Sequence, residues 1–332
     1  MEIAKTIYSA MNTEYDPVCV PDVVFARRES GDLTLQLMLP VDPGILPPVD
    51  YYDPIGPKME EWASRGAKPL HVPAPEDAKF PLIVCCPGSG WAGADGHQYM
   101  ARLVSLARRG FASAAVSYRG TYRDDVVFPA AVQDLREAVR FLRANAPQFR
   151  IDPDRVGLLG DSSGGNTAAI AALAGSEVPG FPELRFDAGE YPEVSSDVKA
   201  VCLVYAPVDL LNMLDDRVRE GKLLRPGEEE SGLPFERMEI WQDRYRDDPE
   251  RYLAAASPIS YVGDAAHLPP VLFVQGDEDQ IIPMAQGLRF CEKLRERGGR
   301  AEFVKVAGGD HGGGIWSREM LDLTAQFFKA YL

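Results

Sequence analysis

From residue 80 onward, short apolar runs alternate with amphipathic stretches. The run Leu82–Cys86 is apolar throughout, which is typical of a strand covered on both faces. The stretch from Pro129 to Ala146 instead repeats its apolar residues at helical spacing, so we expect a helix with one buried face. This alternation predicts an α/β fold with a mainly parallel, doubly wound sheet. Further strands are expected at residues 111–118, 156–159, 198–205, 271–275 and 303–306, with helices at 100–107, after Ser163 and after Ser317.

The N-terminal part of the chain follows a different pattern. Leu33, Leu35, Leu37 and Leu39 alternate strictly with other residues, and the segment Ser30-Gly31-Asp32 before them suits a turn. From Val23, this pattern predicts an antiparallel hairpin at the edge of the sheet.

Three stretches lack regular periodicity, and the third contains one weak helical signal, at residues 238–245. We expect these stretches to be insertions that form a cap or the rim of an active site on a single α/β domain spanning 1–332. Long irregular segments inside a compact domain usually have such roles. The three insertions are residues 41–79, 176–196 and 213–255.

Composition and charge narrow the range of partners. The chain has 35 Lys and Arg against 50 Asp and Glu, a net charge of −15. Such a surface repels phosphate backbones and acidic lipid headgroups, so neither nucleic acid nor a membrane is expected as a partner. The first ten residues lack the apolar segment of a secretory signal, and no apolar run reaches the ~18 residues of a membrane span. We therefore expect a cytoplasmic protein, whereas its oligomeric state is not readable.

The pattern of the five cysteines also favours the cytoplasm. They are odd in number, they mostly stand in apolar runs, and none is spaced as a C-x-x-C pair. We expect them to be free, mostly buried thiols.

A nucleophile motif follows one of the predicted strands. Residues 160–164, Gly-Asp-Ser-Ser-Gly, match G-x-S-x-G, with the strand 156–159 directly before and a small-residue helix directly after. This strand–turn–helix context is typical of a nucleophile elbow, in which a strained turn exposes the hydroxyl of Ser162. The amide of Ser163 would then lie at a helix N-terminus, where it suits an oxyanion. The alternative is an ordinary glycine-rich turn. A dinucleotide-binding loop is excluded, because these glycines do not fit G-x-G-x-x-G.

A serine nucleophile needs a base, and the chain has four histidines. Only His311 lies between the last predicted strand and the last predicted helix, in the glycine-rich segment 308–314. This position fits the Ser–Asp–His order of α/β-hydrolases. His71, His97 and His267 stand elsewhere in the pattern. A loop or metal-binding role is the alternative for His311, although no ligand spacing accompanies it.

The third member of such a site is a carboxylate after the preceding strand. Three carboxylates follow residues 271–275, namely Asp277, Glu278 and Asp279. Any of them is suited to orient an imidazole and stabilise its cation. The pattern of residues does not choose among them.

A second oxyanion donor is expected in the loop after an early strand. Residues 87–91, Pro-Gly-Ser-Gly-Trp, follow the strand 82–86 directly, and their glycines allow a substrate to approach the backbone. We expect the amides of Ser89 and Gly90 to donate, together with that of Ser163. An ordinary glycine turn is the alternative here too.

Taken together, these motifs resemble the α/β-hydrolase superfamily, and within it the carboxylesterase branch of hormone-sensitive-lipase-like and feruloyl-esterase-like proteins. The segment Gly160–Gly165 is similar to the G-[DE]-S-[AS]-G-G elbow of that branch. The resemblance covers roughly residues 80–175, 198–212 and 256–332. Its further blocks are Ser117-Tyr118-Arg119, Phe128-Pro129, Leu142–Ala146, Ile151–Val156, Ser257-Pro258-Ile259 and Gly276-x-x-Asp279-x-x-Ile282-Pro283.

The resemblance implies a fold, an activity and one residue that the pattern left open. It implies the α/β-hydrolase fold, and its last block assigns the acid to Asp279. Two departures stand out. The family's H-G-G-G-W loop has Pro87 in place of its His and Ser89 in place of its middle Gly, and the insertion 41–79 has no counterpart. Support for the oxyanion loop must therefore differ from the family's.

We expect a serine carboxylesterase that uses Ser162, His311 and Asp279 to hydrolyse a small or carbohydrate- or aromatic-linked ester, of acetyl or feruloyl type. No metal and no organic cofactor is implied, and the partner is a small-molecule ester. One alternative is an amidase, such as a formamidase, or an exopeptidase acting through the same triad. An alternative of another class is a non-catalytic receptor or interaction protein with the hydrolase fold.

Overall fold

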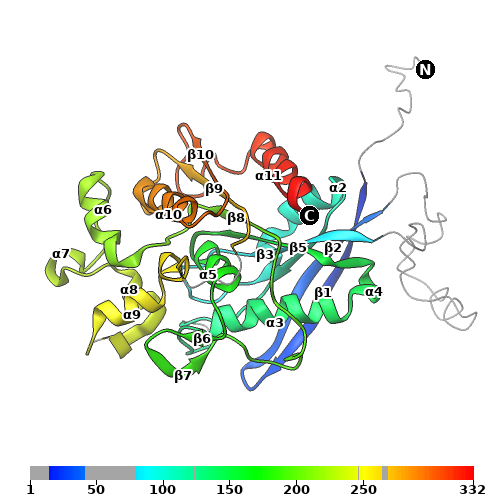
Figure 1. Ribbon diagram of the computed structural model, residues 1–332, viewed down its shortest axis with the longest axis horizontal. Helices are drawn as coiled ribbons and strands as arrows, with labels where there is room; N and C mark the ends of the chain where they lie inside the picture. Colours follow the sequence, from blue (N-terminus) through cyan, green and yellow to red (C-terminus); the bar gives the residue numbers. More distant parts are fainter. Residues whose placement is uncertain (1–14, 42–78, 123, 246, 264–267) are drawn as a thin grey trace, which may run out of the picture.

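A twisted eight-stranded sheet runs through the molecule in the order β1-β2-β4-β3-β5-β8-β9-β10 (Figure 1). The computed structural model describes residues 15–41, 79–122, 124–245, 247–263 and 268–332. The pairs from β4 to β10 are all parallel, whereas β1 and β2 are antiparallel to each other and β2 is antiparallel to β4. The expected mainly parallel α/β sheet is therefore confirmed. Its strands are β1 (Asp16–Arg28), β2 (Gly31–Val41), β3 (Phe80–Cys86), β4 (Ala112–Val116), β5 (Ile151–Asp161), β8 (Ala200–Val204), β9 (Val271–Gly276) and β10 (Ala301–Val306).

The antiparallel hairpin forms where the alternating leucines predicted it. Arg28 pairs with Gly31 across a tight turn, and Leu35 and Leu37 of β2 are fully buried. The first strand begins earlier than expected, at Asp16, because a register shift between Val20 and Val23 lets the pairing continue toward the N-terminus. Such bulges bend a strand without ending its pairing.

Helices cover both faces of the sheet. Alternate residues of β3 divide between the two faces: Leu82 and Val84 pack in the core that includes α3 and α5, and Ile83 and Cys85 pack in the core that includes α2 and α11. This is the period of two that a strand buried on both sides shows. None of the helices in the described ranges is both long and apolar enough to cross a membrane. The covering helices are α2 (Met100–Arg108), α3 (Ala130–Ala144), α5 (Ser162–Leu173), α10 (Met284–Glu296) and α11 (Arg318–Tyr331).

The predicted insertions have more regular structure than their sequences indicated. Residues 176–196 contain a two-stranded antiparallel ribbon of β6 (Glu177–Val178) and β7 (Phe181–Arg185). Residues 213–255 contain α6 (Met213–Arg219), α7 (Glu228–Ser231), α8 (Glu236–Trp241) and α9 (Pro249–Ala255), which lie together at one end of the molecule (Figure 1).

The single helix expected at residues 238–245 corresponds to α8 and to the 3-10 turn η4 (Gln242–Tyr245) after it. The other three helices of this insertion were missed because each has seven residues or fewer, too short to repeat an apolar position more than once. The insertion predicted at 41–79 lies outside the described residues, apart from its two end positions.

Candidate active site

Ser162 stands at the junction of β5 and α5, where the chain turns sharply from strand to helix. Its φ angle is 51°, in the left-handed region that residues with side chains rarely adopt. The two motif glycines make this turn possible. A Cβ on Gly160 would lie 2.4 Å from the carbonyl oxygen of Gly164, and one on Gly164 would lie 2.1 Å from that of Cys86. The geometry is that of a nucleophile elbow.

His311 and Asp279 reach the serine from the ends of two neighbouring parallel strands. His311 follows β10 and Asp279 follows β9. The Nε2 atom of His311 lies 3.0 Å from Ser162 Oγ, and its Nδ1 atom lies 2.9 Å from Asp279 Oδ2. The structure thus brings together the three residues predicted from the sequence, in hydrogen-bonded order. With Nδ1 donating to the carboxylate, Nε2 is left to accept the serine proton.

Both oxygens of the Asp279 carboxylate accept hydrogen bonds from neighbouring groups. Its side chain is fully buried, and its Oδ1 atom accepts hydrogen bonds from the amides of Ile281 and Ile282 at 2.8 and 2.9 Å. Its Oδ2 atom also accepts one from Gln275 Nε2 at 2.9 Å. These bonds fix the oxygen that faces the imidazole.

The other two carboxylates after β9 do not contact His311 within the described structure. Asp277 accepts a hydrogen bond from the Gly308 amide at 2.7 Å and pairs with Lys305 at 3.1 Å. The hydrogen bond from the Gly308 amide, and to a smaller extent Lys305, holds the pKa of this partly exposed carboxyl below its usual value. The backbone amide of Glu278 donates to Gly309, so this residue joins the two loops through its main chain.

Of the remaining histidines, His97 contacts neither Ser162 nor Asp279 in the described structure. It is an exposed residue whose ring lies 2.7 Å from Asp95 and 3.5 Å from Asp22. Its pKa is raised, mainly by the hydrogen bond to Asp95. His71 and His267 lie outside the described residues.

The loop after β3 lies against the elbow, as predicted. A Cβ on Gly88 would stand only 2.8 Å from Ser162 Cβ, which shows how closely the two backbones approach. The Ser89 amide, predicted as an oxyanion donor, instead donates to Ser163 Oγ at 2.8 Å in this conformation. Across the described part of the chain, the Gly90 amide has no such partner. The Ser163 amide belongs to the first turn of α5, where amides have no acceptor within the helix.

Tyr118 supports this loop, in which the family motif H-G-G-G-W of the resemblance has a histidine that this chain lacks. Its hydroxyl donates to the carbonyl of Pro87 at 2.6 Å and lies 3.0 Å from Ser89 Oγ. Because the Tyr118 proton is directed at Pro87, the Ser89 hydroxyl is the donor in the second bond. The two departures from the family loop, Pro87 and Ser89, are therefore the two groups that Tyr118 contacts.

A second set of hydrogen bonds that supports the loop is formed by Asp161, the residue before Ser162. Its carboxylate accepts hydrogen bonds from the Gly88 amide at 2.8 Å and from the hydroxyls of Tyr99 and Tyr205, the latter at 2.9 Å. The ring of Tyr205 lies 4.6 Å from that of His311. Asp161 thus connects the loop after β3 to the residue against which the histidine packs.

These supporting roles were not predicted from the sequence, although two of the residues lie in motifs that were recognised there. Asp161 lies inside the elbow motif, and Tyr118 lies in the Ser117-Tyr118-Arg119 block. Neither position reveals what its side chain contacts, because the partners lie 73 and 31 residues away in the chain.

Comparisons with known proteins agree with this architecture. The esterase LipQ of Mycobacterium tuberculosis is 28% identical over 227 residues, which cover 66% of this chain and 47% of LipQ. The carboxylesterase NlhH of the same organism is 32% identical over 121 residues, which cover 36% of this chain and 37% of NlhH. The chain spans about half the length of the first curated relatives it matches, or less.

Solved structures support the fold over nearly the whole chain. A truncated carbohydrate esterase from gut microbiota superimposes with a TM-score of 0.69 at 24% identity, covering 97% of this chain and 98% of its own. An esterase of Thermogutta terrifontis, solved after phosphoramylation by tabun, gives a TM-score of 0.65 at 21% identity, covering 95% and 94%. These likenesses confirm the predicted α/β-hydrolase fold. The BD-FAE family model matches residues 69–294, and the chain therefore belongs to the BD-FAE family.

Proposed function

We propose that this chain is a serine esterase that hydrolyses a carboxylic ester through Ser162, His311 and Asp279. The observation that carries the proposal is the unbroken hydrogen-bonded series from Ser162 Oγ through both ring nitrogens of His311 to the buried Asp279. The names of its relatives, LipQ and NlhH, support an ester as the substrate. The resemblance to feruloyl-esterase-like proteins supports an acetyl or feruloyl ester linked to a small, carbohydrate or aromatic alcohol.

The chemistry is a two-step acyl transfer. His311 Nε2 takes the Ser162 proton as Oγ attacks the ester carbonyl, and it then returns that proton to the leaving alcohol. A water molecule attacks the acyl-enzyme, again giving its proton to Nε2, and the carboxylic acid leaves as Oγ recovers its proton. Asp279 stabilises the imidazolium formed in each step.

The carbonyl oxygen becomes negatively charged when Oγ attacks, and amide donors must stabilise that charge. We propose the Gly90 and Ser163 amides as the pair that serves it, because both are without acceptors in the described structure. The Ser89 amide would join them only by leaving Ser163 Oγ, which it now contacts.

The test combines turnover with active-site labelling. Ser162→Ala should abolish hydrolysis of p-nitrophenyl acetate and labelling by a fluorophosphonate, while thermal unfolding shows an intact fold. Ser176→Ala, at an exposed serine, is the matched control and should keep both. Substantial turnover by Ser162→Ala would overturn the proposal, and failure of the wild-type protein to label would identify a non-catalytic member of the fold. Parallel assays on a formyl amide and an aminoacyl amide separate ester from amide hydrolysis.

A further inference from the structure

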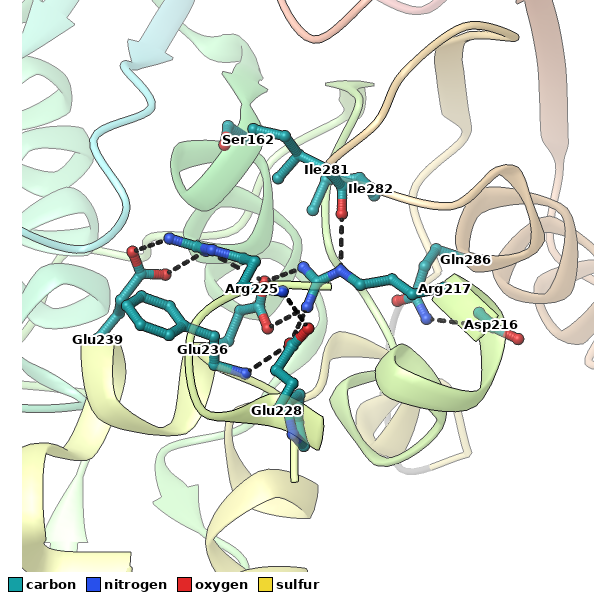
Figure 2. Close-up of polar contacts among 12 residues, drawn as sticks. Ser162, Asp216, Arg217, Arg225, Glu228, Glu236, Glu239, Ile281, Ile282 and Gln286 are labelled. Carbon is teal, nitrogen blue, oxygen red and sulfur yellow. Dashed lines mark hydrogen bonds and ion pairs between the residues drawn. The ribbon is translucent and has the colours of Figure 1, made fainter. Parts of the chain in front are cut away.

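Five charged side chains of the insertion at residues 213–255 form one connected ion-pair network (Figure 2). Arg217 bonds to both Glu228 and Glu236. Arg225 contacts Glu239 through two nitrogens, at 3.1 and 3.0 Å, and reaches Glu236 at 3.5 Å. The network therefore holds two cations and three carboxylates.

Only one end of this network reaches solvent. The side chains of Arg217 and Glu228 are fully buried, and that of Glu236 is 2% exposed. By contrast, Arg225 is 28% exposed and Glu239 is 12% exposed. The buried members satisfy one another, so the Arg225–Glu239 pair is the part of the network that is open to a ligand.

This exposed end lies over the loop that carries the proposed oxyanion donor. A Cβ on Gly90 would stand 3.1 Å from Glu239 Oε1, so the carboxylate covers that residue directly. Thr121 joins the two segments, since its hydroxyl contacts the carbonyls of both Glu239 and Trp91, at 2.9 and 3.2 Å. The pair is thus fixed beside the place where an ester carbonyl would bind.

The buried end of the network reaches the other side of the site. Arg217 Nε donates to the carbonyl of Ile281 at 3.1 Å, and the amide of Ile281 donates to Asp279. Figure 2 shows Ile281 between this contact and Ser162. The network therefore spans from the turn that holds Asp279 to the loop that contains Gly90.

The pair presents a donor and an acceptor side by side. Arg225 has five N–H donors, and its Nε has no hydrogen-bond partner among the residues that the structure describes. Each Glu239 oxygen accepts from Arg225 and retains another lone pair. The guanidinium also lies over the Phe235 ring, 3.9 Å from its centroid, which holds it in place.

Charge selects among possible ligands. An anionic group would meet the Glu239 carboxylate in a chain with a net charge of −15, and a cationic group would meet the Arg225 guanidinium. A neutral hydroxyl both donates and accepts, so two adjacent hydroxyls match one guanidinium N–H and one carboxylate oxygen. Because Glu239 lies directly over Gly90 and Arg225 is paired with it, hydroxyls bound to the two side chains must be close to the ester carbonyl. Those on carbons next to an acylated carbon meet this condition.

We propose that Arg225 and Glu239 determine substrate specificity by binding free hydroxyl groups in the alcohol half of the ester. The inference rests on the proposed esterase function at Ser162. It adds a preference for partly acylated polyols over simple alkyl esters of the same acid.

The experiment compares two acetates that differ in the alcohol half: a methyl glycoside carrying one acetyl group, and butyl acetate. Acid release gives kcat and KM for each. We expect Glu239→Gln to lower the glycoside-to-butyl ratio of kcat/KM about tenfold, the usual loss of a hydrogen bond to a charged group, and to do so mainly through KM. Arg219→Met, at an exposed arginine of the same insertion, should keep the wild-type ratio.

A second variant separates ligand binding from the effect of an unpaired charge. Arg225→Met/Glu239→Met removes the pair together, so neither charge is left alone, and should also lower the ratio. Equal losses on both acetates, or an unchanged ratio, would overturn the proposed hydroxyl site. If Ser162→Ala still hydrolysed both acetates, the esterase proposal itself would fail, which is a distinguishable result.

Discussion

The sheet and the insertion at residues 213–255 hold their parts of the site by different interactions. In β8 and β9 every residue is buried and nearly all are apolar, and β3, which pairs with β5 on the side opposite β8, is almost completely buried. The insertion instead buries Arg217 completely between Glu228 and Glu236. Ser162 and Asp279 thus follow strands of a packed apolar core, whereas Arg225 and Glu239 are fixed by charges.

This difference has a physical consequence for each region. Apolar packing is non-directional and tolerates modest changes of side chain, so a sheet positions the strand ends robustly. A buried ion pair adds little net stability while intact, but it is costly to break because one charge remains without a partner. We therefore expect substitutions of the proposed catalytic residues to lower activity, and substitutions of the buried charges in residues 213–255 to lower the free energy of unfolding.

The largest expected effect is on chemistry. Asp279→Asn should lower kcat by about 10⁴-fold, because an amide facing Nδ1 favours the wrong tautomer of His311. Asp277→Asn is the matched control, since Asp277 contacts Gly308 and Lys305 instead, and should change kcat little. Steady-state kinetics on p-nitrophenyl acetate measures both. The reverse order of effects would assign the acid to Asp277.

The next effect is on stability and concerns the insertion. Arg217→Met leaves Glu228 buried without its cation and Glu236 with only the 3.5 Å contact to Arg225, which should cost about 3–5 kcal/mol of folding free energy. Arg219→Met is the control, because that arginine is 64% exposed, and it should cost no more than about 1 kcal/mol. Denaturant unfolding followed by tryptophan fluorescence, which includes the buried Trp241 of α8, measures the change. Equal stability of the two variants would show that the buried ion pairs do not hold the insertion.

The same contrast explains what could be predicted from the sequence. Ser162 was identifiable because its motif coincides with a strand and a helix that are both visible as local patterns. His311 was identifiable from its position after the last strand. The choice of Asp279 needed family resemblance, since the orientation of three consecutive carboxylates depends on amides such as that of Ile282.

Interactions between distant segments left no local signal. The Ser89 amide was predicted to face an oxyanion, but its direction depends on the hydroxyl of Ser163, 74 residues away. Arg225 and Glu239 pair across 14 residues of a segment without periodicity. An ion pair requires only two residues of opposite charge, so many pairings in this acidic and basic stretch are equally consistent with its composition.

The prediction with the smallest expected effect concerns whether the sheet and residues 213–255 unfold separately. Cys85, Cys86 and Cys202 lie on strands β3 and β8 and are fully buried, as expected for free thiols. Burial raises the pKa of Cys202 to about 12, so almost none of it is the reactive thiolate at pH 8. In the folded protein, a disulfide reagent should therefore label only the partly exposed Cys19.

We expect Arg217→Met to leave this labelling pattern unchanged under native conditions, even though the insertion is destabilised. The reason is that local opening of the insertion does not require the packed strands to separate. Counting labelled thiols by mass spectrometry over time, with Cys19→Ser as the control for the exposed site, measures the outcome. Faster labelling of Cys202 in Arg217→Met would contradict the comparison, because it would show that the sheet opens together with the insertion.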